Sequence, residues 1–179
     1  MFISNAVYLE AVIIAALAVF LTSLKREEKA TLQVPLAVAA ILTPLFAFFS
    51  PNLIAFNILC FLMIPLICST RAQVVPVFVF LMMTAPMIST EINAGGTFLI
   101  TYSIGHSIAL GALIALVVKD GWKGKPKPRW DAAFLTIVFL IWLYTSRDTA
   151  ISNYARGAVY FLLSFIIPYL IISRGVSRP

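Results

Sequence analysis

The chain has 179 residues, of which 61% are hydrophobic and only 11% are charged, and its mean hydropathy is +1.01. Soluble domains are typically about half apolar and a quarter charged, so this composition excludes an ordinary soluble globular domain. The net charge of +6 does not indicate nucleic acid, because the basic residues stand in short loops between apolar runs.

Seven apolar segments follow one another along the chain, and each is bounded by polar or charged residues. We expect a membrane-spanning helix at 5–24, 32–49, 53–68, 74–90, 98–118, 132–145 and 155–173. A span needs about 20 apolar residues, so the third and sixth segments are short. The second and third, separated by "FSPN", could instead form a shallow or re-entrant hairpin. The predicted fold is an all-α polytopic membrane bundle in a single domain, 1–179.

The basic residues predict the orientation of this bundle. Eleven of the 13 Lys and Arg residues fall in alternate loops on one side, and two fall on the other side. Lysine and arginine are enriched in cytoplasmic loops, so we expect the N-terminus outside and the C-terminus in the cytoplasm. The long loop "KDGWKGKPKPRWD" is either a plain determinant of this topology or also a contact with an anionic inner leaflet.

Small residues in the fifth segment predict a close contact between helices. They recur every four residues, at Ser103, Ser107, Gly111 and Ala115. Small side chains at this spacing let two helix backbones approach each other within a membrane. We therefore expect this face to pack against a neighbouring helix.

Three ionisable residues in or beside the apolar segments are candidate functional residues, because such groups are costly in lipid. Glu10 lies near the outer face and needs a partner, which Arg147 or Arg156 could supply. Glu91 stands at the outer end of the fourth segment. His106 lies roughly 12 Å into the fifth, by the helical rise, either as a buried hydrogen-bonding residue or as a group that handles substrate or protons.

The stretch "TSRDTAISNYARG" carries the two outer arginines, Arg147 and Arg156. We place Arg147 at the C-terminal end of the sixth helix, where the helix dipole favours a cation, and Arg156 in the first turn of the seventh, where it opposes one. Either both side chains reach lipid phosphates at the outer interface, or they form a site for phosphate or pyrophosphate. The single histidine and the two cysteines lack metal-ligand spacing, and no nucleotide motif is present, so we expect no metal and no cofactor.

Residues 129–174 resemble the O-antigen ligase and polymerase-type membrane proteins of bacterial polysaccharide assembly. The resemblance rests on "KPRWDAAFLTIVFLIWLY" and "SRDTAISNYARGAVYFLLSFIIPYLIISR". An aspartate opens one helix, an arginine-bearing gap follows, and the last helix ends in Pro168, Tyr169 and the basic Arg174.

This resemblance implies a protein of the bacterial inner membrane that binds undecaprenyl-pyrophosphate-linked glycan at its periplasmic face and takes part in glycan transfer. Arg147 and Arg156 would hold the pyrophosphate, with Glu10, Glu91 and His106 as further candidates. Implied partners are membrane lipid, the lipid-linked glycan and other polysaccharide assembly proteins, without nucleic acid.

The chain departs from the family in its length, because members usually have ten or more helices and a large outer loop in their second half. We therefore expect it to correspond to the N-terminal half of such a protein and to lack part of the active site. The alternative function is a non-catalytic transporter, channel or assembly factor for polysaccharide export, with His106 along a path between kinked helices.

Overall fold

The computed structural model describes residues 2–24, 26–86, 88–94, 97–120, 128–145, 147 and 151–176. Within these ranges, side chains are described for all residues except 2–10, 94, 97–99, 120, 128 and 151–152. The elements are α1 (Phe2–Ser23), α2 (Arg26–Phe49), α3 (Leu53–Ile67), α4 (Arg71–Thr84), β1 (Ser89–Ala94), β2 (Thr97–Ser103), α5 (Ile104–Asp120), α6 (Pro128–Thr145), α7 (Ile151–Phe161), the π-helix η1 (Leu162–Ile166) and α8 (Ile167–Gly175). Because α7, η1 and α8 follow one another without a break, they form one rod, and the described chain is mostly helical.

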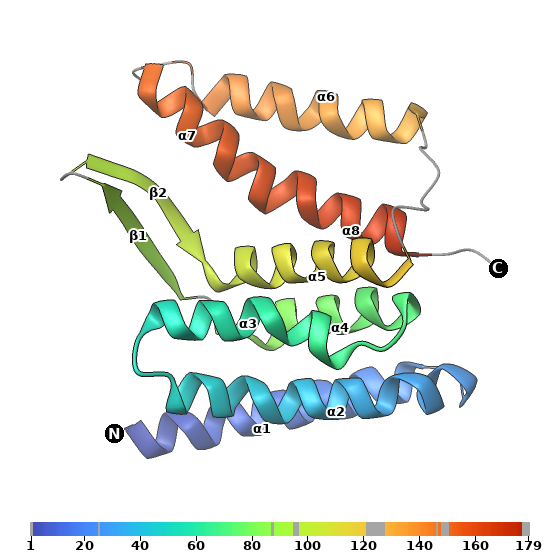
Figure 1. The fold of residues 1–179 in the computed structure, drawn as a ribbon. Coiled ribbons are helices and arrows are strands. Elements are labelled where there is room, and N and C mark those ends of the chain that lie inside the picture. The colour runs from blue at the N-terminus through green and yellow to red at the C-terminus, as the bar shows by residue number, and fades with distance from the viewer. Residues whose placement is uncertain are drawn as a thin grey trace.

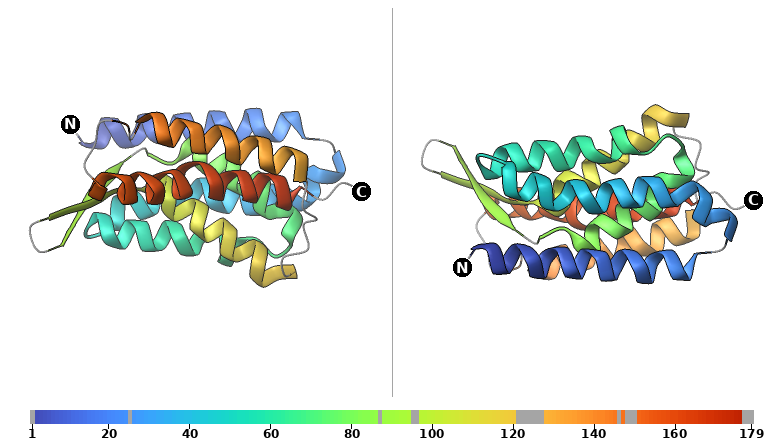
Figure 2. Two further views of the ribbon diagram at one scale, coloured as in Figure 1. Left: turned by 90° about the horizontal axis from the view of Figure 1, so that it is seen from above. Right: turned by 90° about the horizontal axis from the view of Figure 1, so that it is seen from below.

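Consecutive helices run back and forth along a common direction, so that their ends gather at two opposite ends of the bundle (Figure 1). The hairpin end carries the turn at 50–52, the β1–β2 hairpin and Arg147; the basic end carries the starts of α2, α4 and α6 and the end of α8. Seen from above and below, the hairpin projects past the ends of the helices (Figure 2). The seven predicted helical segments therefore correspond to seven helical rods in the described chain.

Two helices in the described part of the chain are long and apolar enough to cross a membrane, Arg26–Phe49 and Asn153–Gly175. Other apolar helices are shorter, among them Leu53–Ile67 and Arg71–Thr84. The second and third predicted segments form two antiparallel helices joined by a short turn (Figure 1). Asn52 ends this turn, and its side-chain oxygen accepts the backbone N–H of Ala55 at 2.8 Å, which caps the start of α3.

The predicted helix boundaries at 74–90 and 98–118 are wrong on the side of the hairpin. Helix α4 ends at Thr84, and residues 89–94 and 97–103 pair as antiparallel strands, with Glu91 opposite Thr101. Pro86 has no backbone N–H to continue α4. The following residues are rich in Thr, Ile, Phe and Tyr, which fit strands better than helices.

Helices α3 and α5 approach each other closely at Gly111, as the small-residue spacing predicts. A Cβ atom added to Gly111 would lie 2.2 Å from the backbone carbonyl oxygen of Phe61 in α3. Ser107 and Ala115, one turn to either side, are both fully buried. The absence of a side chain at Gly111 therefore fixes the distance between the two helices.

Helix α6 is attached to α8 at the basic end by a polar cluster. The Asp131 carboxylate accepts a hydrogen bond from the Tyr169 hydroxyl at 2.7 Å and forms an ion pair with Arg174. The backbone carbonyl of Arg174 in turn accepts a hydrogen bond from Arg71 of α4. The Tyr169 ring stacks on Phe134, with ring centroids 3.9 Å apart. Asp131 thus contacts both Tyr169 and Arg174 and joins the start of α6 to α8.

We predict that Gly111→Ala destabilises the bundle by about 1–3 kcal/mol, the usual range for overpacking. The matched control is Gly105→Ala, because its added Cβ would lie 3.4 Å from the flexible end of the Met82 side chain. Thermal unfolding of the purified variants, followed by circular dichroism, measures the difference. Equal unfolding midpoints for the two variants would contradict the close approach of α5 to Phe61.

Candidate functional site

A cavity of about 340 Å³ lies at the hairpin end, where β2 leads into α5. The hairpin, the start of α5 and the rod α7–η1–α8 form its walls, and Met82 of α4 closes it from a fourth side. We call it the hairpin-end cavity. Its polar lining comes from Ser89, Thr101, Ser103, His106, Tyr160 and Ser164.

Ser103 and His106 form a reciprocal pair at the start of α5. The backbone N–H of His106 donates to the Ser103 hydroxyl at 3.4 Å, and the backbone N–H of Ser103 donates to Nδ1 of His106 at 3.1 Å. This is the arrangement of a capping box, with histidine at the position usually taken by Glu or Gln. Because Nδ1 accepts a hydrogen bond, the neutral imidazole carries its proton on Nε2.

The Nε2 atom of His106 reaches from α5 to the π-helix η1, where it lies 2.9 Å from the Ser164 hydroxyl oxygen. With its proton on Nε2, His106 donates to Ser164, and the hydroxyl proton of Ser164 remains available for another acceptor. Four residues after Ser164, Pro168 lacks the N–H that would bond the Ser164 carbonyl in an α-helix. A wider π turn is one way to accommodate this, and such turns occur frequently at functional sites.

Two tyrosines hold the His106 ring from the sides. The ring centroid of Tyr102 lies 5.5 Å from that of His106, and the Tyr160 centroid lies 5.8 Å from it, both in edge-on contacts. With 5% of its surface exposed, His106 is a buried residue. The ring is therefore fixed by packing as well as by two hydrogen bonds, and its Nε2–H points at the Ser164 hydroxyl.

His106 lies closer to the hairpin end than the sequence predicts. It is the third residue of α5 and belongs to its first turn, because the residues before Ile104 form β2 and not helix. The predicted depth of roughly 12 Å along a helix is therefore wrong. Since Gly105 and His106 both line the cavity, the N-terminal end of α5, with its partial positive charge, borders it.

Arg156 lies in the second turn of α7, not in the first, because α7 begins at Ile151. The unfavourable effect of the helix dipole is consequently weaker than expected, since it falls off within the first turn. Its guanidinium donates to the side chain of Asn153 at 3.2 Å. Tyr160 stands four residues later, on the same face of the helix, so Arg156 lies one turn beyond the wall of the hairpin-end cavity.

Glu91 lies on the face of the hairpin that forms a wall of this cavity. It pairs with Thr101 across the two strands, and paired residues share a face of the sheet. Thr101 lines this cavity, whereas the exposed Glu91 borders the neighbouring cavity between the hairpin and α3. Of the predicted residues, His106 therefore lines the hairpin-end cavity, whereas Arg156 and Glu91 lie beside its walls.

Of the other two predicted residues, Arg147 does not line this cavity. Arg147 follows the end of α6 and is exposed; its backbone N–H bonds the Tyr144 carbonyl at 3.4 Å. Its guanidinium lies 5.8 Å from the centre of the Tyr144 ring, so it packs against its own helix. The side chain of Glu10 lies outside the described residues, as does any pairing between Glu10 and an arginine.

Ser164 and Tyr160 were not among the residues predicted from the sequence. A signal was present for Ser103, because Ser-x-x-His places a hydroxyl and a ring nitrogen at capping-box spacing. For Ser164, the sequence feature that could have indicated it is Pro168, because a proline four residues later interrupts the regular helical hydrogen bonding at Ser164. Among the described residues, no group of three or more His, Cys, Asp or Glu side chains could hold a metal ion.

No protein-family model, curated protein or solved structure matches the chain.

We predict that Ser103→Ala lowers the free energy of unfolding by about 1 kcal/mol, the usual cost of losing a helix N-cap. His106→Gln retains more stability than His106→Ala, because a glutamine at this position also accepts the Ser103 N–H. The control is Thr31→Ala, whose exposed hydroxyl bonds only the carbonyl of Glu28 within its own helix. Unfolding midpoints measure all four variants. If His106→Gln and His106→Ala were equally unstable, the capping role of the ring would be refuted.

Proposed function

We propose that this protein spans a bacterial inner membrane, with its hairpin end in the periplasm, and binds a polyprenyl-pyrophosphate-linked glycan there. The observation that carries the proposal is the hairpin-end cavity. It combines a helix N-terminus with the hydroxyl of Ser164, which the Nε2–H of His106 holds in place, and Arg156 stands one turn away. These are groups that bind anionic oxygens.

The outer surface of the bundle supports a membrane-spanning protein. Large apolar side chains on several helices are exposed, among them Phe49, Leu66, Met83 and Val118, each with about three quarters of its surface accessible. Monomeric soluble proteins rarely expose extensive apolar patches, whereas lipid is a suitable environment for them. Two helices reach the length of a span, and a helix satisfies most of its backbone hydrogen bonds within itself, as a membrane requires.

The distribution of charge supports the proposed orientation. Among the described residues, the basic end carries Arg26, Lys29, Arg71, Lys119, Arg129 and Arg174. The hairpin end carries only Arg147 and Arg156 among the described basic residues. By the enrichment of positive charge in cytoplasmic loops, the basic end faces the cytoplasm and the hairpin-end cavity faces the periplasm.

The chemistry that this arrangement supports is the binding and release of a pyrophosphate group. In glycan transfer from a lipid carrier, the bond between the sugar and the pyrophosphate breaks, and negative charge develops on the departing phosphate oxygen. The Ser164 hydroxyl, held in place by the Nε2–H of His106, and the Arg156 guanidinium would stabilise that charge. With the resemblance of residues 129–174, this favours a component of a polysaccharide polymerase or ligase.

We predict that Arg156→Ala weakens binding of a polyprenyl pyrophosphate about tenfold or more. The reason is the loss of a charge-assisted hydrogen bond, which contributes about 1.5–3 kcal/mol. Arg147→Ala would have a smaller effect, since that side chain lies against Tyr144. The matched control is Arg129→Ala, an exposed arginine at the basic end. Binding to protein in nanodiscs is measured with a radiolabelled polyprenyl pyrophosphate, and equal retention by Arg156→Ala and Arg129→Ala would refute the site.

Cysteine labelling in intact cells tests the orientation separately. Cys60 and Cys68 are both buried, so the wild-type chain provides a low background. We expect Arg147→Cys to react with a membrane-impermeant maleimide from outside the inner membrane, and Arg129→Cys to react only after permeabilisation. Labelling of both positions from the same side would show that the chain does not cross the membrane as proposed.

A further inference from the structure

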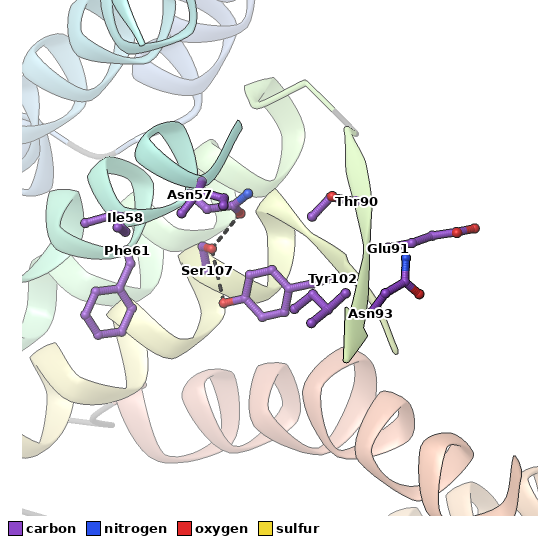
Figure 3. A pocket seen from close by; sticks show the side chains of 10 residues that line it. Asn57, Ile58, Phe61, Thr90, Glu91, Asn93, Tyr102 and Ser107 are labelled. Atoms are coloured by element: carbon purple, nitrogen blue, oxygen red, sulfur yellow. Dashed lines mark hydrogen bonds between the residues drawn. The ribbon is translucent and has the colours of Figure 1, made fainter. Parts of the chain in front are cut away.

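A second cavity, of about 520 Å³, lies on the other side of strand β2, between the hairpin, α3 and the start of α5 (Figure 3). Successive side chains of a strand point to opposite faces. Tyr102 accordingly lines this cavity, whereas Thr101 and Ser103 line the hairpin-end cavity. The two cavities are separate, and they share β2 and the first turn of α5 as a wall. We call the second one the α3–hairpin cavity.

One wall of the α3–hairpin cavity is apolar and open to the surroundings. Ile54, Ile58 and Phe61 come from one face of α3, at intervals of four and three residues. The exposed fractions of Ile54 and Ile58 are 69% and 54%. An apolar chain could therefore lie along α3 and leave the cavity between these side chains without crossing a polar rim.

The opposite wall is polar but uncharged. The Ser107 hydroxyl donates to the Asn57 side-chain oxygen at 2.7 Å and lies 3.1 Å from the Tyr102 hydroxyl (Figure 3). Because the single proton of Ser107 is used on Asn57, Tyr102 donates to Ser107, and the Tyr102 oxygen keeps lone pairs for a ligand. Thr90 pairs with Tyr102 across the hairpin and adds another hydroxyl on the same face.

Charge is directed away from this polar wall. Among the described residues that line the cavity, Glu91 is the one charged residue. Its side chain, like that of Asn93, points to the other side of the strand from Tyr102 (Figure 3). Among the described lining residues, an anionic head group would therefore find no basic side chain to pair with. A cationic head group would find no carboxylate pointing toward it, because the Glu91 side chain points away. The chemistry of the wall is complementary to hydroxyl groups, which both donate and accept hydrogen bonds.

We propose that the α3–hairpin cavity binds an uncharged amphiphile. Its hydroxyl-bearing head group contacts Tyr102, Asn57 and Thr90, and its apolar tail lies along Ile54, Ile58 and Phe61. The volume falls in the range of small-molecule sites, about 300–1,000 Å³, and a largely apolar lining with a few convergent polar groups is typical of them. This site goes beyond the pyrophosphate site and does not depend on it, because the ligand, the cavity and the contacting side chains are different.

The test uses a photoreactive alkyl glucoside with the full chain in nanodiscs, and mass spectrometry to map the adducts. We expect adducts on α3 and β2, and their loss when unlabelled alkyl glucoside is added. Ile58→Trp fills the cavity and lowers labelling about tenfold, while Tyr102→Phe keeps the ring and lowers it about fivefold. The control, Ile137→Trp, replaces an isoleucine of similar exposure on α6 and leaves labelling unchanged.

Competition distinguishes the two sources of such a head group. If a long-chain alcohol competes as well as the glucoside, the ligand is a lipid alcohol; if only the glucoside competes, it is a glycoside. Equal competition by an alkyl sulfate or an alkyl ammonium, or wild-type labelling of Ile58→Trp, would overturn the proposal. Polyprenyl pyrophosphate binding is measured in the same preparations, and Ile58→Trp leaves it unchanged, so that failure of one site is separable from failure of the other.

Discussion

The structure depends on the close approach of α5 to α3 at Gly111. At this depth the backbone carbonyl of Phe61 occupies the space where any other residue would have a side chain. One turn toward the hairpin, Ser107 is close enough to α3 to donate to Asn57. One turn further, Ser103 ends β2 and caps α5. A single stripe of small residues therefore changes its role along the helix, from packing to hydrogen bonding to capping.

Much of the helical architecture is readable in the sequence, since a chain in lipid must satisfy its backbone hydrogen bonds within each segment. The prediction fails between Ala85 and Ser103, where the facing ends of the predicted helices 74–90 and 98–118 contain strands instead. Hydropathy does not separate strand from helix in an apolar run. The information was in the residue types: Pro86 stops α4, two glycines occupy 95–96, and β-branched and aromatic residues follow them. The error in the depth of His106 follows directly from this one.

The candidate site was predictable only in part, and the reason differs between its residues. His106 and Glu91 are recognisable because ionisable groups are rare in apolar segments. Arg156 is recognisable because it falls on the side of the bundle that has few basic residues. Ser164 has no such signal, because serine is common in helices that pack closely. Its position opposite His106 depends on the π turn before Pro168 and on the contact between α5 and the last rod, which are properties of the folded chain.

The two ends of the bundle use charge in different ways. At the basic end, Asp131 lies in the first turn of α6 and Arg174 in the last turn of α8, so each complements its helix dipole as well as the other. At the hairpin end, the N-terminal end of α5 borders a cavity, and the His106 ring, held by Ser103, donates there to Ser164 without adding a full charge.

Strand β2 divides this end into two chemically distinct halves. One half presents the donors of α5, η1 and Ser103, and the other presents the uncharged Tyr102, Ser107 and Asn57. The His106 and Tyr102 rings touch across the dividing wall. A pyrophosphate in the first half would lie next to the His106 ring, and an uncharged ligand in the second would lie next to the Tyr102 ring that contacts it. Both strands of the hairpin and the first turn of α5 line both cavities, so these are the elements through which binding in one half would affect the other.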